Sequence, residues 1–336
     1  MRLDSLGDVL VTGPALRALA SCGDDVTLLC GPRGRAAADL LPGIGEILQW
    51  CAPWIDPEPA PVDPDDIAAL RDLITRGRFD RALIFTSFHQ SPLPTALVLR
   101  LAGVPWVGAI SEDYPGSLLD LRLTDVPDDI PEHERALRLV RAAGCDLPAG
   151  DDGLPAIRPV PTSGVLEEIG GPYVVLHPGT SVPARAWPPE RFRSAADRLV
   201  ERGHRVVVTG AEHERELTAY VADGIALDLG GRLDLGQLAG VLAAADCVVV
   251  GNTGPAHLAA AVRTPVVSVF APTVPAARWA PQGAPVVLLG DQDAPCRDSR
   301  ATICPIPGHP CLASVTPGDV ADAVEQLCGR PVKEFA

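Results

Sequence analysis

The 336-residue sequence contains a single lysine, Lys333, so arginine carries almost all of its positive charge. Any phosphate contact that other proteins make through lysine therefore falls to arginine here. Acidic residues outnumber basic ones by 43 to 28, and the net charge of −15 repels nucleic acid and anionic lipid over most of the surface. We therefore expect no nucleic-acid partner.

The sequence also lacks an unbroken apolar run long enough for a membrane-spanning helix, although 47% of its residues are hydrophobic. Its first residues show no signal-peptide pattern. The nine cysteines are scattered, which is typical of reduced thiols and not of a disulfide framework. These absences predict a soluble, cytoplasmic protein.

Two nucleotide-binding motifs are missing as well. No G-x-G-x-x-G and no G-x-x-x-x-G-K-[ST] occurs, which disfavours a dinucleotide-dependent dehydrogenase and a P-loop NTPase. Cys296, Cys304, His309 and Cys311 gather in a proline-rich segment, but their spacing is irregular and includes no C-x-x-C pair. We expect a structural loop there and no zinc site.

Short β-branched runs alternate with longer segments of helical periodicity, which predicts parallel strands joined by helices. The expected strands are 26–30, 82–85, 173–177, 205–209, 247–251 and 266–270, and helices are expected from about Arg33, through 96–101 and over 317–328, the last with Thr316 as N-cap. Strands as apolar as those of the second half are usually covered on both faces. The sequence predicts an α/β fold with two doubly wound, Rossmann-like domains facing a central cleft.

A stretch rich in proline, glycine and aspartate from 144 to 163 is the candidate linker. We place an N-terminal domain at 1–155 and a C-terminal domain at 156–336. Only Met1 precedes the segment Arg2–Asp8, which resembles the turn that follows the first strand of such a domain. We therefore expect the first strand to be truncated, with the natural protein beginning upstream.

Asp8 is the candidate catalytic residue of the first half. It lies before a predicted helix that has Pro14 in its first turn and runs to about Ser21. A carboxylate at this junction can act as a general base that removes a proton from an acceptor hydroxyl. It can equally be an N-terminal cap of the helix, and spacing alone does not decide between the two.

Two later strands each end in a polar, glycine-containing turn that opens a helix. The first turn holds Thr180 and Ser181 and is followed by Arg185, a combination that can cradle phosphate through amides, hydroxyls and a guanidinium. The alternative is an ordinary loop with a solvated arginine.

The second turn holds Asn252, Thr253 and Gly254. Thr253 and the free amides of the following helix would face an anion, with the helix dipole adding favourable charge. His257, in the first turn of that helix, either contacts a ligand or packs against its neighbours.

These segments, taken in order, resemble glycosyltransferase family 9, the family of ADP-heptose:lipopolysaccharide heptosyltransferases. The resemblance rests on the GDVL turn, the HPG stretch that leads to a basic residue and Trp-Pro, the TGAEHE turn and the TGPAHLAAA block followed by TPVV. It implies a GT-B fold, with the acceptor on the N-terminal domain and the nucleotide-sugar on the C-terminal one. It also implies inverting transfer without a cofactor or a catalytic metal.

The resemblance assigns roles to individual residues. Asp8 matches the family's proposed base, and Arg185 matches a phosphate-contacting position that is commonly lysine. Asn252 stands where the family usually has aspartate, and either Glu212 or Glu214 would hold the ribose or base. The predicted donor-binding residues are Thr180, Ser181, Arg185, Glu212, Asn252, Thr253, Gly254 and His257.

The predicted function is inverting transfer of a heptose-like sugar from a nucleoside-diphosphate sugar to a saccharide or glycolipid acceptor. A nucleotide-sugar epimerase or hydrolase on the same fold, and a catalytically silent nucleotide-sugar-binding relative, are the alternatives. No basic amphipathic helix indicates docking to a membrane, so a transient membrane contact would come only through a glycolipid acceptor. The sequence leaves the sugar, the nucleotide and the acceptor open.

Overall fold

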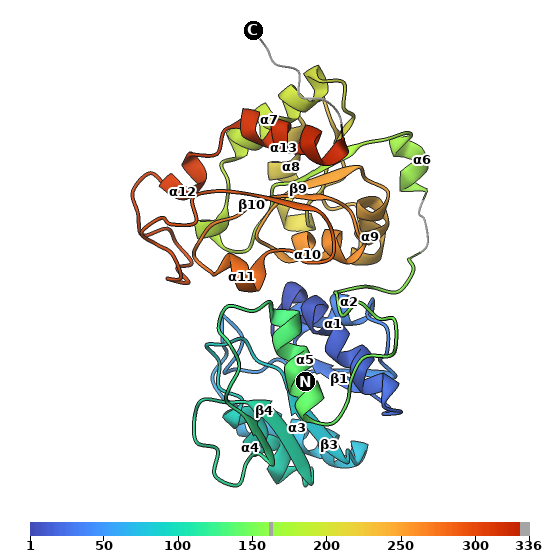
Figure 1. The fold of residues 1–336 in the computed structure, drawn as a ribbon, viewed down its shortest axis with the longest axis vertical. Helices are drawn as coiled ribbons and strands as arrows, with labels where there is room; N and C mark the ends of the chain where they lie inside the picture. The colour runs from blue at the N-terminus through green and yellow to red at the C-terminus, as the bar shows by residue number, and fades with distance from the viewer. Residues whose placement is uncertain (161–163, 330–336) are drawn as a thin grey trace. The chain divides into compact units, whose positions relative to one another are not determined.

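The computed structural model describes residues 1–160 and 164–329. The chain divides into two compact units, Met1–Ile157 and Arg158–Ala336, and in each unit parallel strands lie among helices (Figure 1). The division falls within the predicted linker segment. Among the described residues, none of the helices combines the length and the apolar character needed to span a bilayer.

The C-terminal unit is built on one six-stranded parallel sheet with the order β11-β10-β9-β6-β7-β8. Its strands are β6 (Val174–His177), β7 (Val206–Val208), β8 (Leu227–Asp228), β9 (Cys247–Gly251), β10 (Val266–Val269) and β11 (Val286–Leu289). The strands from β6 to β8 extend the sheet to one side, and β9 then returns to the other side of β6. This reversal confirms the predicted doubly wound sheet.

Helices cover both faces of this sheet, with α7, α8 and α13 on one side and α9 and α10 on the other (Figure 1). The helices of the unit are α6 (Val165–Ile169), α7 (Pro189–Glu201), α8 (Arg215–Ala222), α9 (Leu235–Ala243), α10 (Gly254–Ala261), α11 (Ala276–Trp279), α12 (Pro310–Ala313) and α13 (Pro317–Cys328), with 3-10 turns η2 (Pro183–Arg185) and η3 (Glu212–Glu214). Thr316 Oγ1 accepts a hydrogen bond from the Asp319 amide at 3.1 Å, which confirms the predicted cap.

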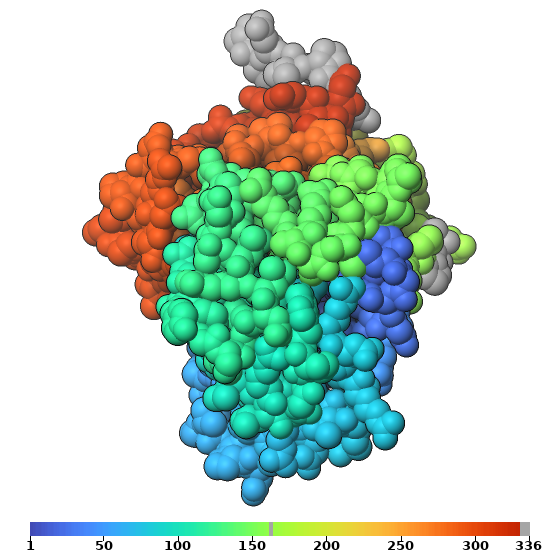
Figure 2. All heavy atoms as spheres, turned by 60° about the horizontal axis from the view of Figure 1, so that its bottom comes forward, coloured from blue at the N-terminus to red at the C-terminus, as the bar shows by residue number. Residues whose placement is uncertain are grey.

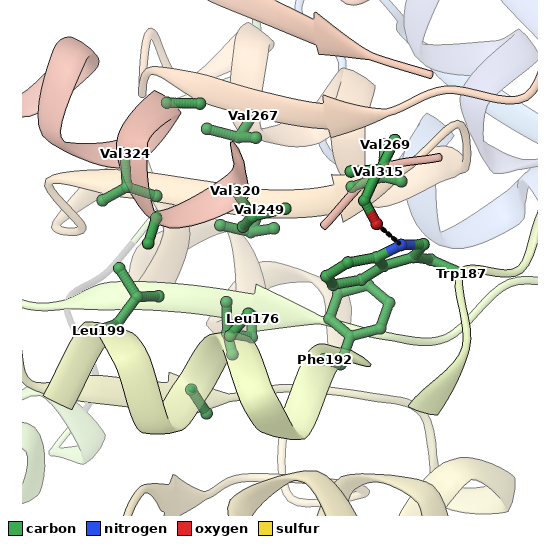
Figure 3. Packing of buried hydrophobic residues seen from close by; sticks show 14 of the residues in the cluster. Leu176, Trp187, Phe192, Leu199, Val249, Val267, Val269, Val315, Val320 and Val324 are labelled. Carbon is green, nitrogen blue, oxygen red and sulfur yellow. Dashed lines mark hydrogen bonds between the residues drawn. The ribbon is translucent and has the colours of Figure 1, made fainter. Parts of the chain in front are cut away.

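The core of the C-terminal unit lies between this sheet and the pair α7 and α13 (Figure 3). Trp187 and Phe192 meet edge to face with ring centroids 4.9 Å apart, and the Trp187 indole donates to the Val315 carbonyl at 3.3 Å. The indole therefore buries its apolar area without leaving its N–H unpaired. This packing holds the start of α7, and with it the preceding loop, against the end of the sheet.

The N-terminal unit contains two smaller parallel sheets, β1-β2 and β3-β4-β5. Its elements are α1 (Leu6–Ser21), β1 (Thr27–Cys30), η1 (Pro32–Gly34), α2 (Arg35–Ala38), β2 (Glu46–Gln49), α3 (Pro64–Gly77), β3 (Arg81–Ile84), α4 (Leu93–Leu101), β4 (Trp106–Ile110), β5 (Leu121–Leu123) and α5 (Glu132–Ala142). Figure 2 shows the side of this unit formed largely by the teal and green segments, which follow β3 in the chain.

The first residues of the chain join these two sheets. The Arg2 amide donates to Leu29 of β1 at 3.0 Å, while the Met1 amine donates to Leu83 of β3 at 2.7 Å and the Met1 carbonyl accepts from Phe85. Residues 1–3 thus occupy the position of a central strand, and the unit has the strand order β2-β1-(1–3)-β3-β4-β5. The prediction that the turn begins at Arg2 is wrong, because Arg2 pairs with β1 as a strand residue.

The prediction for the first helix is also wrong at its start. Helix α1 begins at Leu6, and Pro14 lies inside it. A proline in a helix interior forgoes one hydrogen bond and costs about 3 kcal/mol in a free helix. Most of α1 is apolar and buried, including Leu10, Leu16 and the proline itself, so burial of the helix outweighs that cost.

A cavity of about 450 Å³ opens between β1 and β3, directly beside Met1. Backbone hydrogen-bonding groups alternate in direction along a strand. The backbone groups of Thr27 and Arg81 therefore point the same way as those of Leu29 and Leu83, which pair with Arg2 and Met1, and they face this cavity. Its apolar lining includes Leu16, Leu19, Leu28, Leu48, Ile74, Phe79 and Leu99. Burial lowers the pKa of the Met1 amine to about 5, so the amine loses its proton when the chain folds near neutral pH.

We predict that four apolar β-branched residues fused ahead of Met1 raise the free energy of unfolding by about 2 kcal/mol or more, because they fill the cavity and pair with both strands. The fusion also converts the Met1 amine to an uncharged amide, which removes the cost of deprotonating that amine on folding. The gain in the free energy of unfolding is therefore larger near pH 6 than near pH 9, where the amine of the unfolded chain is already neutral. Urea unfolding at both pH values measures this.

A Gly-Ser tetrapeptide at the same position is the control for this fusion. It also converts the amine of Met1 to an amide but adds no apolar side chains. Equal stability of the two fusions would contradict the cavity-filling account.

Candidate functional site

The candidate residues of both units lie in loops that follow the carboxyl ends of parallel strands. In such sheets ligands bind where the strand order reverses, because the loops on either side of that point diverge and leave a crevice. The reversal in the C-terminal unit lies between β6 and β9. In the N-terminal unit it lies beside residues 1–3, between β1 and β3.

The loop after β6 is held close to the loop after β7. The His177 Nδ1 atom lies 3.0 Å from the Thr209 hydroxyl, and both side chains are buried. Burial lowers the pKa of His177, against the opposing effect of the nearby Glu214 carboxylate. His177 is therefore a neutral structural link between the two loops at physiological pH.

Of the two glutamates left open by the sequence, Glu214 lies against the loop after β6. A Cβ atom on Gly179 would meet the Glu214 carboxylate at 2.0 Å, so only glycine permits this approach. Glu214 also accepts from the Ala211 amide at 2.8 Å. The Glu212 side chain is 71% exposed and pairs with Arg215 at 3.0 Å, and its role stays a prediction.

Arg185 lies at the end of η2, and this turn packs over the end of β9. A Cβ atom on Gly251 would lie 3.4 Å from the Arg185 carbonyl oxygen, an ordinary contact distance, so the two backbone segments lie side by side. Within the same loop the Val182 amide donates to the Thr180 hydroxyl at 3.3 Å, while Ser181 is exposed. The structure thus brings the Arg185 turn to the strand that leads into Asn252.

The loop that contains the cysteine and histidine cluster supports η2 from outside. The Ala184 amide donates to the Thr302 carbonyl at 2.9 Å, and a ring nitrogen of His309 lies 3.0 Å from the Ala184 carbonyl. Within residues 1–160 and 164–329, no group of three or more His, Cys, Asp or Glu side chains is placed to hold a metal ion. His309 therefore contacts the backbone of η2.

Asn252 follows β9 and is only 6% exposed. Its amide nitrogen lies 3.5 Å from the Ala271 carbonyl, and its Oδ1 atom has no hydrogen-bond partner within the described part of the chain. An ionised aspartate could not donate to that carbonyl and would place a buried charge beside it. An amide is therefore the side chain that suits the backbone around position 252.

Thr253 and Gly254 lie at the amino end of α10, with Thr253 at the N-cap. The Thr253 amide is taken up by the Gly251 carbonyl at 3.0 Å, so its hydroxyl is the group available to a ligand. His257 is buried and its ring lies 6.3 Å from that of Trp279 on α11. This position fits the packing interpretation of His257, and a ligand contact stays a prediction.

Asp8 lies in the first turn of α1, at the reversal point of the N-terminal unit. Its Oδ1 atom accepts from Arg2 at 2.7 Å and from the Ser87 hydroxyl at 3.3 Å. Its Oδ2 atom accepts from the Ser5 hydroxyl at 2.6 Å and from the Ser5 amide at 3.2 Å. Burial opposes ionisation, but the Arg2 guanidinium and these hydrogen bonds hold the pKa of Asp8 below its ordinary value.

Sequence reasoning missed the residues around Asp8. Arg2 is 3% exposed and contacts Asp4 at 3.1 Å as well as Asp8, and Gln90 donates to Asp4 at 2.5 Å. Burial raises the pKa of Asp4 to about 6, with Arg2 acting in the opposite direction and the Asp8 carboxylate adding to the rise. The signal in the sequence was an arginine inside a short strand, a position at which a charge needs a partner.

The model of the family described as glycosyltransferase family 9 (heptosyltransferase) matches residues 67–307. The chain belongs to this family. The predicted family and the predicted glycosyltransferase class are thereby confirmed. The match begins after Asp8, so it covers the C-terminal candidate residues and leaves Asp8 outside.

Individual relatives agree with this assignment. The chain is 28% identical to lipopolysaccharide heptosyltransferase 1 of Escherichia coli K12 over 291 residues, covering 82% of this chain and 88% of that protein. It is 38% identical to the Pseudomonas aeruginosa protein of the same name over 137 residues, or 40% of this chain and 38% of that protein.

Solved structures confirm the predicted GT-B fold class. The structure of E. coli ADP-heptose lipopolysaccharide heptosyltransferase II has a TM-score of 0.72 at 20% identity and covers 97% of both chains. A family 9 glycosyltransferase from Veillonella parvula has a TM-score of 0.77 at 16% identity, covering 97% of this chain and 95% of that one.

We predict that Gly179→Ala lowers the free energy of unfolding by about 1 kcal/mol, because its Cβ displaces the Glu214 carboxylate from the Ala211 amide. Thermal unfolding measures the loss. Gly164→Ala is the control, since a Cβ there meets no atom within 4 Å. In a Glu214→Ala background the cost of Gly179→Ala should vanish, and an unchanged cost would refute the proposed contact.

Proposed function

We propose that this family 9 enzyme transfers heptose from ADP-heptose to a lipopolysaccharide-type saccharide or glycolipid acceptor, with inversion at the anomeric carbon. The E. coli relative whose alignment covers 82% of this chain is a lipopolysaccharide heptosyltransferase, and E. coli heptosyltransferase II is named for ADP-heptose. These names support the donor and acceptor classes. The observation that carries the proposal is the close packing of the Arg185 turn over the end of β9 at the reversal point of the C-terminal sheet.

The C-terminal unit would bind the donor at this point. Arg185 supplies the positive charge, and the hydroxyls of Thr180 and Thr253 with the Gly254 amide at the start of α10 supply hydrogen bonds to the diphosphate. As the sugar leaves, negative charge grows on the diphosphate, and these fixed donors stabilise it. We propose that the guanidinium serves here in place of a catalytic metal.

The N-terminal unit would bind the acceptor, with Asp8 as the base. The acceptor hydroxyl gives its proton to Asp8 while its oxygen forms a bond to the anomeric carbon. The bond from that carbon to the diphosphate oxygen breaks, and its electron pair leaves with ADP. A single displacement of this kind needs no covalent intermediate and inverts the anomeric centre. A cytoplasmic location stays a prediction.

We predict that Asp8→Asn lowers kcat for transfer by about a hundredfold or more, because an amide cannot take the acceptor proton, while donor affinity is retained. Steady-state transfer assays and calorimetric titration with the donor measure the two effects. Asp72→Asn, on the exposed surface of α3, is the control variant. Unchanged kcat in Asp8→Asn would remove Asp8 from the reaction.

We predict that Arg185→Ala weakens ADP binding roughly tenfold to hundredfold, the usual value of one charge-assisted hydrogen bond to phosphate. Calorimetric titration with EDTA present measures the affinity and tests binding without a bridging metal. Arg297→Ala removes an exposed arginine of the same unit and should bind ADP like the unaltered protein. Full affinity in Arg185→Ala, or binding abolished by EDTA, would contradict the proposed donor site.

A further inference from the structure

The two carboxylate oxygens of Asp8 have different surroundings. The Oδ1 atom points inward, where Arg2 Nη2 donates to it and also to the Ser87 hydroxyl at 3.0 Å. The Oδ2 atom accepts only from the exposed N-cap residue Ser5, through its hydroxyl and its amide. One oxygen is therefore held by the buried Arg2 and Ser87, and the other is held only by an exposed residue.

Arg2 is held both at its backbone and at its guanidinium. Its backbone amide is paired with β1, its Nε side contacts Asp4 at 3.1 Å, and the Asp4 carboxylate is held in turn by Gln90 from the loop after β3. The guanidinium thus lies between two carboxylates, hydrogen-bonded to Asp8 and paired by charge alone with Asp4, whose Oδ2 atom makes no hydrogen bond in the described part of the chain.

The charges that face this guanidinium come from every element packed around it. Asp4 and Asp8 flank it, the buried Glu132 at the start of α5 adds a further negative charge, and Ser87 contributes a neutral hydroxyl. Arg135 of α5 lines the same small pocket as Arg2 and Glu132 and adds a second positive charge there. The network therefore has more carboxylates than cations. Removing the Arg2 guanidinium would leave the Asp8 carboxylate without its paired cation and make its negative charge less favourable.

We propose that Arg2 is a positioning residue of the transfer reaction, which fixes Oδ1 of Asp8 so that Oδ2 is the atom that takes the acceptor proton. The acceptor hydroxyl replaces the Ser5 hydroxyl at Oδ2, donates its proton there and attacks the anomeric carbon. Arg2 touches neither substrate, and it acts through the orientation and ionisation of Asp8. This inference rests on the proposed function.

The role of Arg2 has a signature in the pH dependence of kcat. Asp8 is active when ionised, so kcat falls as the pH drops through its pKa. Because Arg2 holds that pKa below the ordinary value, its removal raises the pKa and moves the acid limb of the profile to higher pH. A purely structural role would lower stability and leave the limb in place.

The test compares Arg2→Met, Arg2→Lys and Arg17→Met. We expect Arg2→Met to lower kcat about tenfold to hundredfold at near-constant donor KM, with the acid limb moved to higher pH, and Arg2→Lys to recover part of both. Arg17→Met breaks another arginine pair of α1, with Asp151 at 2.7 Å, and should keep the kcat and the pH profile of the unaltered enzyme.

Ser87→Ala provides a second route if Arg2→Met does not fold. It removes one hydrogen bond to Oδ1 without changing any charge, and we expect kcat to fall several-fold with the donor KM retained. Normal kcat and an unmoved acid limb in a folded Arg2→Met would overturn the inference, and where Arg2→Met does not fold, normal kcat in Ser87→Ala would overturn it. If Asp8→Asn is also fully active, the proposed base itself fails, whereas an inactive Asp8→Asn limits the failure to Arg2.

Discussion

Parallel pairing of short, buried strands is the constraint on which both units of this protein depend. Parallel strands bring the loops after their carboxyl ends to one edge of the sheet, and the reversal of strand order decides which of those loops diverge. In the C-terminal unit the reversal at β6 and β9 selects the loops of Arg185 and Asn252. In the N-terminal unit the reversal beside residues 1–3 selects Asp8.

The two sheet edges differ in the charge that they carry. The C-terminal edge presents backbone amides, hydroxyls and an arginine. Because Asn252 is neutral, position 252 adds no carboxylate that would repel a bound diphosphate. The N-terminal edge holds the largely buried Asp8 carboxylate, and the Arg2 guanidinium favours its ionised form, which the proposed role as base requires. The division matches a reaction in which one group accepts a proton and another accommodates a departing anion.

Much of this arrangement could be predicted from the sequence, because uniformly apolar runs such as 247–251 and glycine turns such as that of Thr253 are local signals. The start of α1 could not, since tertiary burial overrides the local preference of Pro14. The contacts of Arg2 and Glu214 could not be predicted either. Their partners, Ser87 for Arg2 and Gly179 for Glu214, are distant in the chain and meet them only in the folded unit.

The most direct test of the central claim is mass spectrometry of a lipopolysaccharide-type acceptor after incubation with the protein and ADP-heptose, with ADP measured in parallel. The account predicts an acceptor heavier by one heptose, with one ADP released for each heptose added and none released without acceptor. Release of ADP without acceptor would indicate a hydrolase. Donor binding with neither ADP release nor a modified acceptor would indicate a silent relative, and either result would contradict the account.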